Sequence, residues 1–179
     1  MKAEELVDRA WSQCGLPTKY RMGGGKIVPE GDTCHDERGS ADCSAFVDWC
    51  LGLRKYQGST HTFLKALNGG WLNTDGIWWD AVMTGVGFFE ETLSGPELGA
   101  AVVYPAKWVL KTADQLHGWN PKVGHVGVVT GLDPLRVVHC SNSNWRGEKD
   151  AIGETDAAVF ERVRATQFVR CTTVEEAPK

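Results

Sequence analysis

The sequence predicts an α+β fold in which N-terminal helices pack on a central antiparallel β-sheet. Apolar residues recur at helical spacing in the first third of the chain, whereas β-branched runs bounded by turn residues dominate the second half. Helices followed by strands are typical of the α+β class. With 179 residues and 42% hydrophobic content, we expect a single domain over residues 1–179 with one core.

Three helices are expected in the first part of the chain. The first covers Ala3 to Cys14, and Gly15 with Pro17 ends it. The second runs from about Asp42 to Leu53 with Ser40 or Asp42 as its cap, and a short third covers Thr60 to Leu67. Residues 20–39 are rich in glycine and charge and predict a loop, in which Lys26 to Pro29 can add a short edge strand. Residues 69–95 show no regular pattern.

Four strands are expected later, at Ala100 to Tyr104, Val123 to Thr130, Leu135 to Cys140 and Gln167 to Thr172. The middle two should form a hairpin through the turn at residues 131–134. A pairing centred on Leu132 sets His125 directly opposite His139, with Cβ atoms about 5 Å apart. A register shift of two keeps both histidines on one face, whereas a shift of one separates them.

Cys43 lies in the first turn of the second predicted helix, where unpaired N–H groups and the helix dipole favour a thiolate. The alternative is a small hydrophobic residue in a core helix. His125 supplies a base, and His139 a polar partner for the second ring nitrogen of that base, as nucleophilic catalysis requires. Asn142 or Asn144 is the reserve for that partner.

The motifs around these residues are Asp42-Cys43-Ser44-Ala45-Phe46-Val47, Gly124-His125-Val126-Gly127-Val128-Val129 and His139, with Tyr20-Arg21-Met22-Gly23-Gly24 upstream. In this order they resemble the NlpC family of bacterial cell-wall cysteine peptidases. The chain departs from the family pattern at Ala45, where the family has glycine, and at Met22, where it has tryptophan. The stretch between Cys43 and His125 is also longer than is typical of the family.

The resemblance implies a papain-like fold and a Cys43-His125-His139 triad that forms an acyl-enzyme without a cofactor or a metal. It places Tyr20 beside the nucleophile, at the oxyanion site. The implied substrate is a peptidoglycan stem peptide, and the family's usual target is the γ-D-glutamyl to diamino-acid bond. A CHAP-type amidase, a hydrolase of a non-wall amide and a catalytically idle binding module are the alternatives.

Residues 55–98 form a tryptophan-rich insertion relative to the family pattern, and we expect them to border the site. Six tryptophans in or beside predicted loops can line a groove for sugars or peptides, although aromatic residues of long loops also build satellite cores: Trp71, Trp78, Trp79, Trp108, Trp119 and Trp145. Trp11 and Trp49 are expected in the core. The polar residues Asp42, Ser44 and Asp75 complete the predicted substrate contacts.

Composition disfavours several other functions. A net charge of -4 without a basic cluster argues against nucleic acid and against acidic membrane surfaces. No apolar run approaches the roughly 20 residues needed to span a bilayer. The first residues lack a signal-peptide pattern, so we expect cytoplasmic synthesis and, for a cell-wall role, delivery that needs no signal peptide. The six cysteines include no C-x-x-C pair, which makes disulfides and zinc weak hypotheses, and the oligomeric state stays open.

Overall fold

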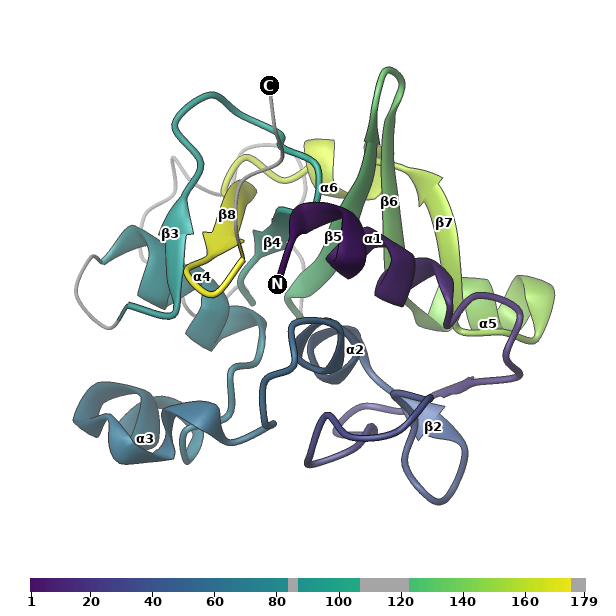
Figure 1. Ribbon diagram of the computed structural model, residues 1–179, viewed down its shortest axis with the longest axis horizontal. Helices are drawn as coiled ribbons and strands as arrows, with labels where there is room; N and C mark the ends of the chain where they lie inside the picture. The colour runs from purple at the N-terminus through teal and green to yellow at the C-terminus, as the bar shows by residue number, and fades with distance from the viewer. Residues whose placement is uncertain (84–86, 107–122, 175–179) are drawn as a thin grey trace.

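A computed structural model describes residues 1–83, 87–106 and 123–174. Its centre is a six-stranded antiparallel sheet with the order β3-β8-β4-β5-β6-β7 (Figure 1). The strands are β3 (Phe89–Glu91), β4 (Ala101–Tyr104), β5 (His125–Leu132), β6 (Leu135–Cys140), β7 (Ile152–Asp156) and β8 (Gln167–Cys171). The helices are α1 (Ala3–Trp11), α2 (Cys43–Cys50), α3 (Thr62–Asn68), α4 (Thr74–Val82), α5 (Asn142–Glu148) and α6 (Ala158–Glu161). The predicted α+β class is confirmed, and α1 and α2 pack on β5.

Helix α2 begins where its sequence predicts. Asp42 is the N-cap, and its side chain accepts a hydrogen bond of 2.9 Å from the backbone N–H of Ala45. The other candidate cap, Ser40, belongs instead to the short strand β2 (Ser40–Ala41). Every residue of α2 is buried, so this helix lies inside the core rather than along its surface. The packing of α2 therefore sets the position of Cys43, the first residue of the helix.

The loop before α2 differs from its prediction. Lys26 to Pro29 form no strand, because the N–H of Lys26 bonds to the carbonyl of Cys34, whereas the carbonyl of Ile27 accepts from Lys55. These bonds lead to two separate segments and build no ladder. The strand pair of this region is β1 (Lys19–Tyr20) with β2, which run parallel and place Tyr20 beside Ala41, two residues before Cys43.

The β5–β6 hairpin forms as predicted, but its register differs from a pairing centred on Leu132. Leu132 pairs with Leu135 across a loop of Asp133 and Pro134, and a bulge at Thr130 shifts the pairing between Gly131 and Val129. Without that extra residue, His125 and His139 would face opposite sides of the sheet. The bulge returns both to one face, where they are diagonal neighbours rather than directly opposed.

The region predicted to be irregular contains α4 and β3. Helix α4 starts at an Asn73 cap, which accepts from the N–H of Gly76, and it packs on β3, β4 and β8. The sequence pattern hides this helix because α4 is buried on nearly all sides and therefore lacks an amphipathic period. Strand β3 extends the sheet by pairing with β8. Helices α5 and α6 and strand β7 were also absent from the prediction.

Two tryptophans expected in the core behave differently. Trp49 is 4% exposed, whereas Trp11 is 47% exposed and donates through Nε1 to Glu154. The prediction for Trp11 was wrong because α1 buries only the face that carries Leu6, Val7 and Ala10. Trp108 and Trp119 lie outside the described residues. Within the described ranges, no helix is both long and apolar enough to cross a membrane.

Candidate functional site

Cys43 is the first residue of α2, which packs on β5, the strand that starts at His125. Figure 1 shows α2 beneath this end of the strand, and the two elements are in contact. Backbone N–H groups of Val126, Ser44 and Cys43 lower the pKa of the Cys43 thiol and so favour its thiolate form. Cys43 is only 5% exposed. The structure shows no hydrogen bond between the Cys43 thiol and the His125 ring.

His125 and His139 are in direct contact. Nε2 of His125 lies 2.7 Å from Nδ1 of His139, and the two rings meet edge to face with centroids 4.9 Å apart. His125 is 9% exposed and His139 is 4% exposed. This hydrogen bond engages the second ring nitrogen of His125 and leaves its Nδ1 without a hydrogen-bond partner among the described residues.

Two glycines of the G-H-V-G motif make room for this arrangement. A Cβ at Gly127 would lie 2.5 Å from Cγ1 of Val137 and 2.9 Å from Cβ of His139. Both approaches are closer than real Cβ atoms tolerate, so only glycine lets His139 lean across β5 toward His125. A Cβ at Gly124 would lie 2.3 Å from Oγ1 of Thr74, at the start of α4. The motif therefore reflects close packing on both sides of His125.

Aromatic rings enclose the histidines. Phe160 of α6 stacks on the His125 ring at a centroid distance of 5.2 Å and an interplanar angle of 17°, and it meets His139 edge to face. Tyr104 pairs directly opposite His125 in the β4–β5 ladder. Burial and the nearby Cys43 raise the pKa of Tyr104, and burial, Cys43 and Asp42 raise that of Tyr20. Both phenol rings therefore belong to the neighbourhood of the thiol.

Burial keeps Cys43, His125 and His139 uncharged in the resting protein. Burial, followed by the negative charge of Asp42, raises the pKa of Cys43 far above its usual value, despite the N–H groups that lower it. Burial lowers the pKa of His125 to about 3, with His139 adding to the shift, and burial lowers that of His139 to about 4. At neutral pH the group is thus a thiol beside two neutral imidazoles. The helix start was expected to favour the thiolate, but the cost of desolvating a charged sulfur is larger.

A cavity of about 450 Å³ opens beside the two histidines. Its lining includes Tyr20, Tyr104, His125 and His139, but not Cys43. Further polar lining groups come from α5, β7 and the end of α6: Ser141, Asn142, Ser143, Asn144, Thr155, Asp156 and Arg162. Of these, only the two asparagines were singled out from the sequence. Asn144 donates to the backbone carbonyls of His139 and Ala151 and makes no contact with either imidazole that would serve the reserve role.

The predicted substrate contacts lie apart from this cavity. Oδ1 of Asp42 accepts from Ala45 N–H and from the Ser44 hydroxyl, while its Oδ2 accepts from Gly23 N–H at 2.7 Å. Asp42 and Ser44 are buried at the helix start and are not part of the cavity lining. They stabilise the first turn of α2, and Asp42 also holds the loop that follows Tyr20 through its bond to Gly23.

Asp75, Trp78 and Trp79 belong to α4. Asp75 is 4% exposed and accepts from the backbone N–H of Ala106, just beyond β4. Trp78 is buried, donates through Nε1 to the carbonyl of Ala165 and meets Trp79 edge to face. These contacts anchor α4 to the sheet, and none of the three residues lines the cavity beside the histidines.

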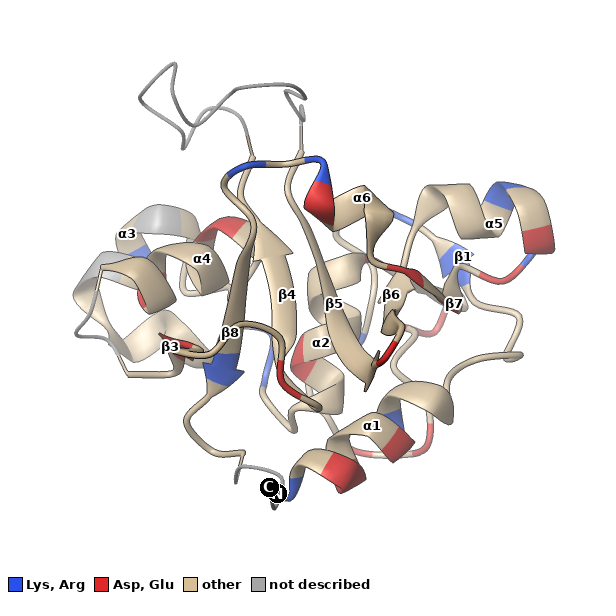
Figure 2. Cartoon of the chain, turned by 90° about the horizontal axis from the view of Figure 1, so that it is seen from above, with Lys and Arg blue, Asp and Glu red and all other residues tan. Residues whose placement is uncertain are grey.

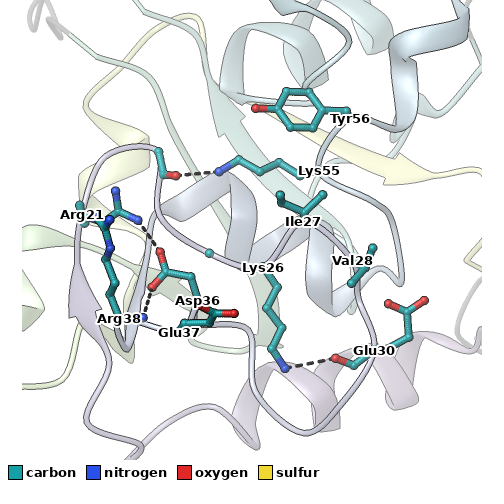
Figure 3. Close-up of a pocket in the computed structure, with 12 residues that line it drawn as sticks. Arg21, Lys26, Ile27, Val28, Glu30, Asp36, Glu37, Arg38, Lys55 and Tyr56 are labelled. Carbon is teal, nitrogen blue, oxygen red and sulfur yellow. Dashed lines mark hydrogen bonds and ion pairs between the residues drawn. The ribbon is translucent and has the colours of Figure 1, made fainter.

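A larger cavity of about 590 Å³ is lined by residues of the 21–38 loop together with Lys55 and Tyr56 (Figure 3). Its buried cation, Lys55, donates to the carbonyls of Gly23 and Gly24 and lies over the Trp71 ring. Arg21 is paired with Asp36, also in this cavity. These three charged groups hold the loop, and the described residues that line this cavity include no histidine or cysteine.

No other feature of the described residues suggests a different chemistry. They contain no cluster of three or more histidine, cysteine or acidic residues that could hold a metal ion. Figure 2 shows lysine and arginine dispersed among aspartate and glutamate along the ribbon. All six cysteines are free thiols.

Comparison with known proteins gives little further direction. No protein-family model matches the sequence, and no curated protein matches it. Among solved structures, the chain is similar to "The crystal structure of Ly7917", with 16% identity and a TM-score of 0.49. It is also similar to "The crystal structure of Ly7917 with the hydrolyzing product of MDP", with 17% identity and a TM-score of 0.47. Both matches cover 96% of this chain and 63% of the Ly7917 chain. Similarity at this level says nothing about activity, so function is argued from this chain's own residues.

Proposed function

We propose that this chain is a cysteine hydrolase of the NlpC type that cleaves an amide bond in peptidoglycan stem peptides. One observation carries the proposal: two buried histidines share a 2.7 Å hydrogen bond at the end of the sheet that packs against the helix starting with Cys43. Burying two imidazoles costs free energy that an apolar pair would not, so their retention beside a thiol favours a chemical role. The motif resemblance supplies the substrate class.

In the proposed reaction, Nδ1 of His125 takes the proton of Cys43 as the sulfur attacks the carbonyl carbon of the amide. Because thiol and imidazole are both neutral at rest, this transfer accompanies the attack and makes His125 a general base. The Cys43 N–H and the Tyr20 hydroxyl stabilise the oxyanion, an interaction worth about 3 kcal/mol per donor. His125 then protonates the leaving amine, and a water activated by His125 releases the acyl group.

His139 supports the charged state of His125 through the hydrogen bond at Nε2. Cys43 is not part of the cavity lining, so substrate binding must displace a neighbouring side chain to reach the sulfur. Tyr20 lines the cavity and is only partly buried, which makes it the side chain we expect to move. On this basis the oxyanion contact from Tyr20 forms only with substrate in place.

The cavity supports a substrate that carries a carboxylate. Arg162 lines it, is exposed and forms no ion pair with another described residue. Stem peptides have free carboxylates, and a guanidinium binds such a group through two parallel hydrogen bonds. We also propose that residues 1–179 form one domain, because Leu64, Ile77 and Phe89 of the 55–98 region share the buried cluster that contains α2 and the sheet.

Two alternatives are less well supported. A CHAP-type amidase commonly uses Glu or Asn as the third residue of its triad. Here the His139 ring is hydrogen-bonded to His125, and Asn144 donates to a backbone carbonyl instead. A catalytically idle binding module has no need for a cysteine, a base and its partner in one place. A hydrolase of a non-wall amide uses the same groups and differs only in what the cavity admits.

The test is digestion of purified muropeptides by the parent and by Cys43→Ala, followed by mass spectrometry. We expect the parent to cut at a single bond, between D-glutamate and the diamino acid, and Cys43→Ala to yield no products. Cys14→Ala removes a partly exposed thiol in the turn that follows α1 and serves as the matched control, which should retain parent activity. Equal cleavage by Cys43→Ala would refute the proposal, and a parent without muropeptide products would favour a different amide.

A further inference from the structure

A side chain of β7 continues the line of contacts that begins at His125. Nε2 of His139 lies 3.0 Å from the hydroxyl oxygen of Thr155, and this hydroxyl lies 2.8 Å from the backbone carbonyl of Asp156. Gly153 pairs directly opposite His139, so Thr155 is the diagonal neighbour of His139 on β7. His125, His139 and Thr155 thus form one row across three adjacent strands, each meeting the next along a diagonal.

The protons of this row can be counted. Three contacts link His125, His139, Thr155 and the Asp156 carbonyl, and three protons are available when both imidazoles are neutral. A carbonyl only accepts, so the Thr155 hydroxyl must donate to it. The hydroxyl oxygen then accepts from Nε2 of His139, which leaves Nδ1 of His139 as an acceptor for Nε2–H of His125.

We propose that Thr155 is a positioning residue that sets the tautomers of both histidines and leaves Nδ1 of His125 unprotonated. No other described side chain forms a hydrogen bond to either ring. The face of His125 is covered by Phe160, which is apolar, and the Asp156 carboxylate accepts from the N–H of Ala158. The row therefore has one proton arrangement in which every contact is a hydrogen bond.

The catalytic consequence rests on the proposed function. A free Nδ1 can take the Cys43 proton and later pass it to the leaving amine, while Nε2–H stays on His125 throughout. With Thr155 replaced by valine, Nε2 of His139 loses its acceptor, and His139 can hold its proton on Nδ1 instead. His125 would then accept at Nε2 and hold its own proton on Nδ1, where it blocks transfer from the thiol.

The experiment combines NMR of imidazole nitrogens with steady-state kinetics on the intact chain. In ¹⁵N-histidine-labelled parent at neutral pH, we expect Nδ1 of His125 to be pyridine-type and its Nε2 to carry the proton. Thr155→Val should shift this population and lower kcat about tenfold to a hundredfold with KM little changed, against a loss of roughly 10⁴-fold for a triad held in the wrong tautomer. Thr155→Ser keeps the hydroxyl and should restore both readouts.

Thr172→Val removes an exposed hydroxyl just after β8 that donates to the carbonyl of Gly87, and it is the control for the loss of a threonine hydroxyl elsewhere. Valine favours strands, so we expect Thr155→Val to fold, and circular dichroism checks this. Parent tautomers in Thr155→Val would overturn the role of Thr155 whatever the activity. Correct tautomers in a parent that hydrolyses nothing would overturn the proposed function alone.

Discussion

Acidification from about pH 7 to about pH 5 should destabilise the folded protein through His125 and His139. Burial lowers their pKa values to about 3 and about 4, whereas an unfolded chain has the ordinary histidine value of about 6.5. Between these limits the unfolded state binds more protons than the folded state, so the free energy of unfolding falls as pH falls. The contribution is fully present above the unfolded pKa. Each histidine should cost about 2 kcal/mol over this interval, or about 4 kcal/mol together.

The comparison with His139→Asn isolates this effect. Asparagine keeps an acceptor near Nε2 of His125 and removes one titrating group, so the variant should lose about 2 kcal/mol less than the parent between the two pH values. Buried carboxyls with raised pKa values, such as Asp75 and Asp80, act in the opposite direction but equally in both proteins. Urea unfolding at each pH gives the four free energies needed. Equal losses in parent and variant would contradict the burial of His139 as a neutral ring.

Three further predictions concern the surroundings of the site. Gly127→Ala should lower the free energy of unfolding measured in urea by about 2 kcal/mol and displace His139, because the new Cβ would lie 2.9 Å from Cβ of His139. The control is Gly147→Ala, which has open space around the new methyl group and should cause no comparable loss. Asp42→Asn keeps the cap acceptor but removes a charge that raises the pKa of Cys43, so iodoacetamide should alkylate Cys43 faster at a fixed pH, and an unchanged rate would contradict this. Lys55→Met should lower the free energy of unfolding by about 1–3 kcal/mol, since it leaves the buried Gly24 carbonyl and the partly buried Gly23 carbonyl unpaired. Urea unfolding equal to the parent would show that the loop does not need this contact.

Local sequence patterns predicted many of the helices and strands. The Asp42 cap, the apolar run after Cys43 and the glycine-bounded strands around His125 and Val138 all produced elements near their expected positions. The failures share a physical cause. Helix α4 is buried on nearly all sides and so shows no amphipathic period. The short elements α5, α6 and β7 depend on tertiary contacts: α5 packs on β1 and β7, α6 packs on β4, and β7 pairs with β6.

The candidate site shows the same division. A cysteine at a helix start and histidines on two strands of one hairpin can be read from the order of residues alone, since a cap and a strand period are local properties. Phe160 and Thr155 cannot, because nothing in their local sequence says that they meet the histidine rings. Phe160 reaches the rings because α6 packs on the sheet, and Thr155 reaches His139 because β7 pairs with β6 at the sheet edge.

The sequence by itself determined that Cys43 opens a helix and that His125 and His139 belong to a hairpin. Tertiary structure decided which way the histidines face and what charge the group carries. One extra residue at Thr130 changes the strand register, and with a side-chain period of two this choice brings the histidines together or separates them. Burial decides the charge, because the cost of desolvating a thiolate depends on everything packed around Cys43 and exceeds what the helix start provides.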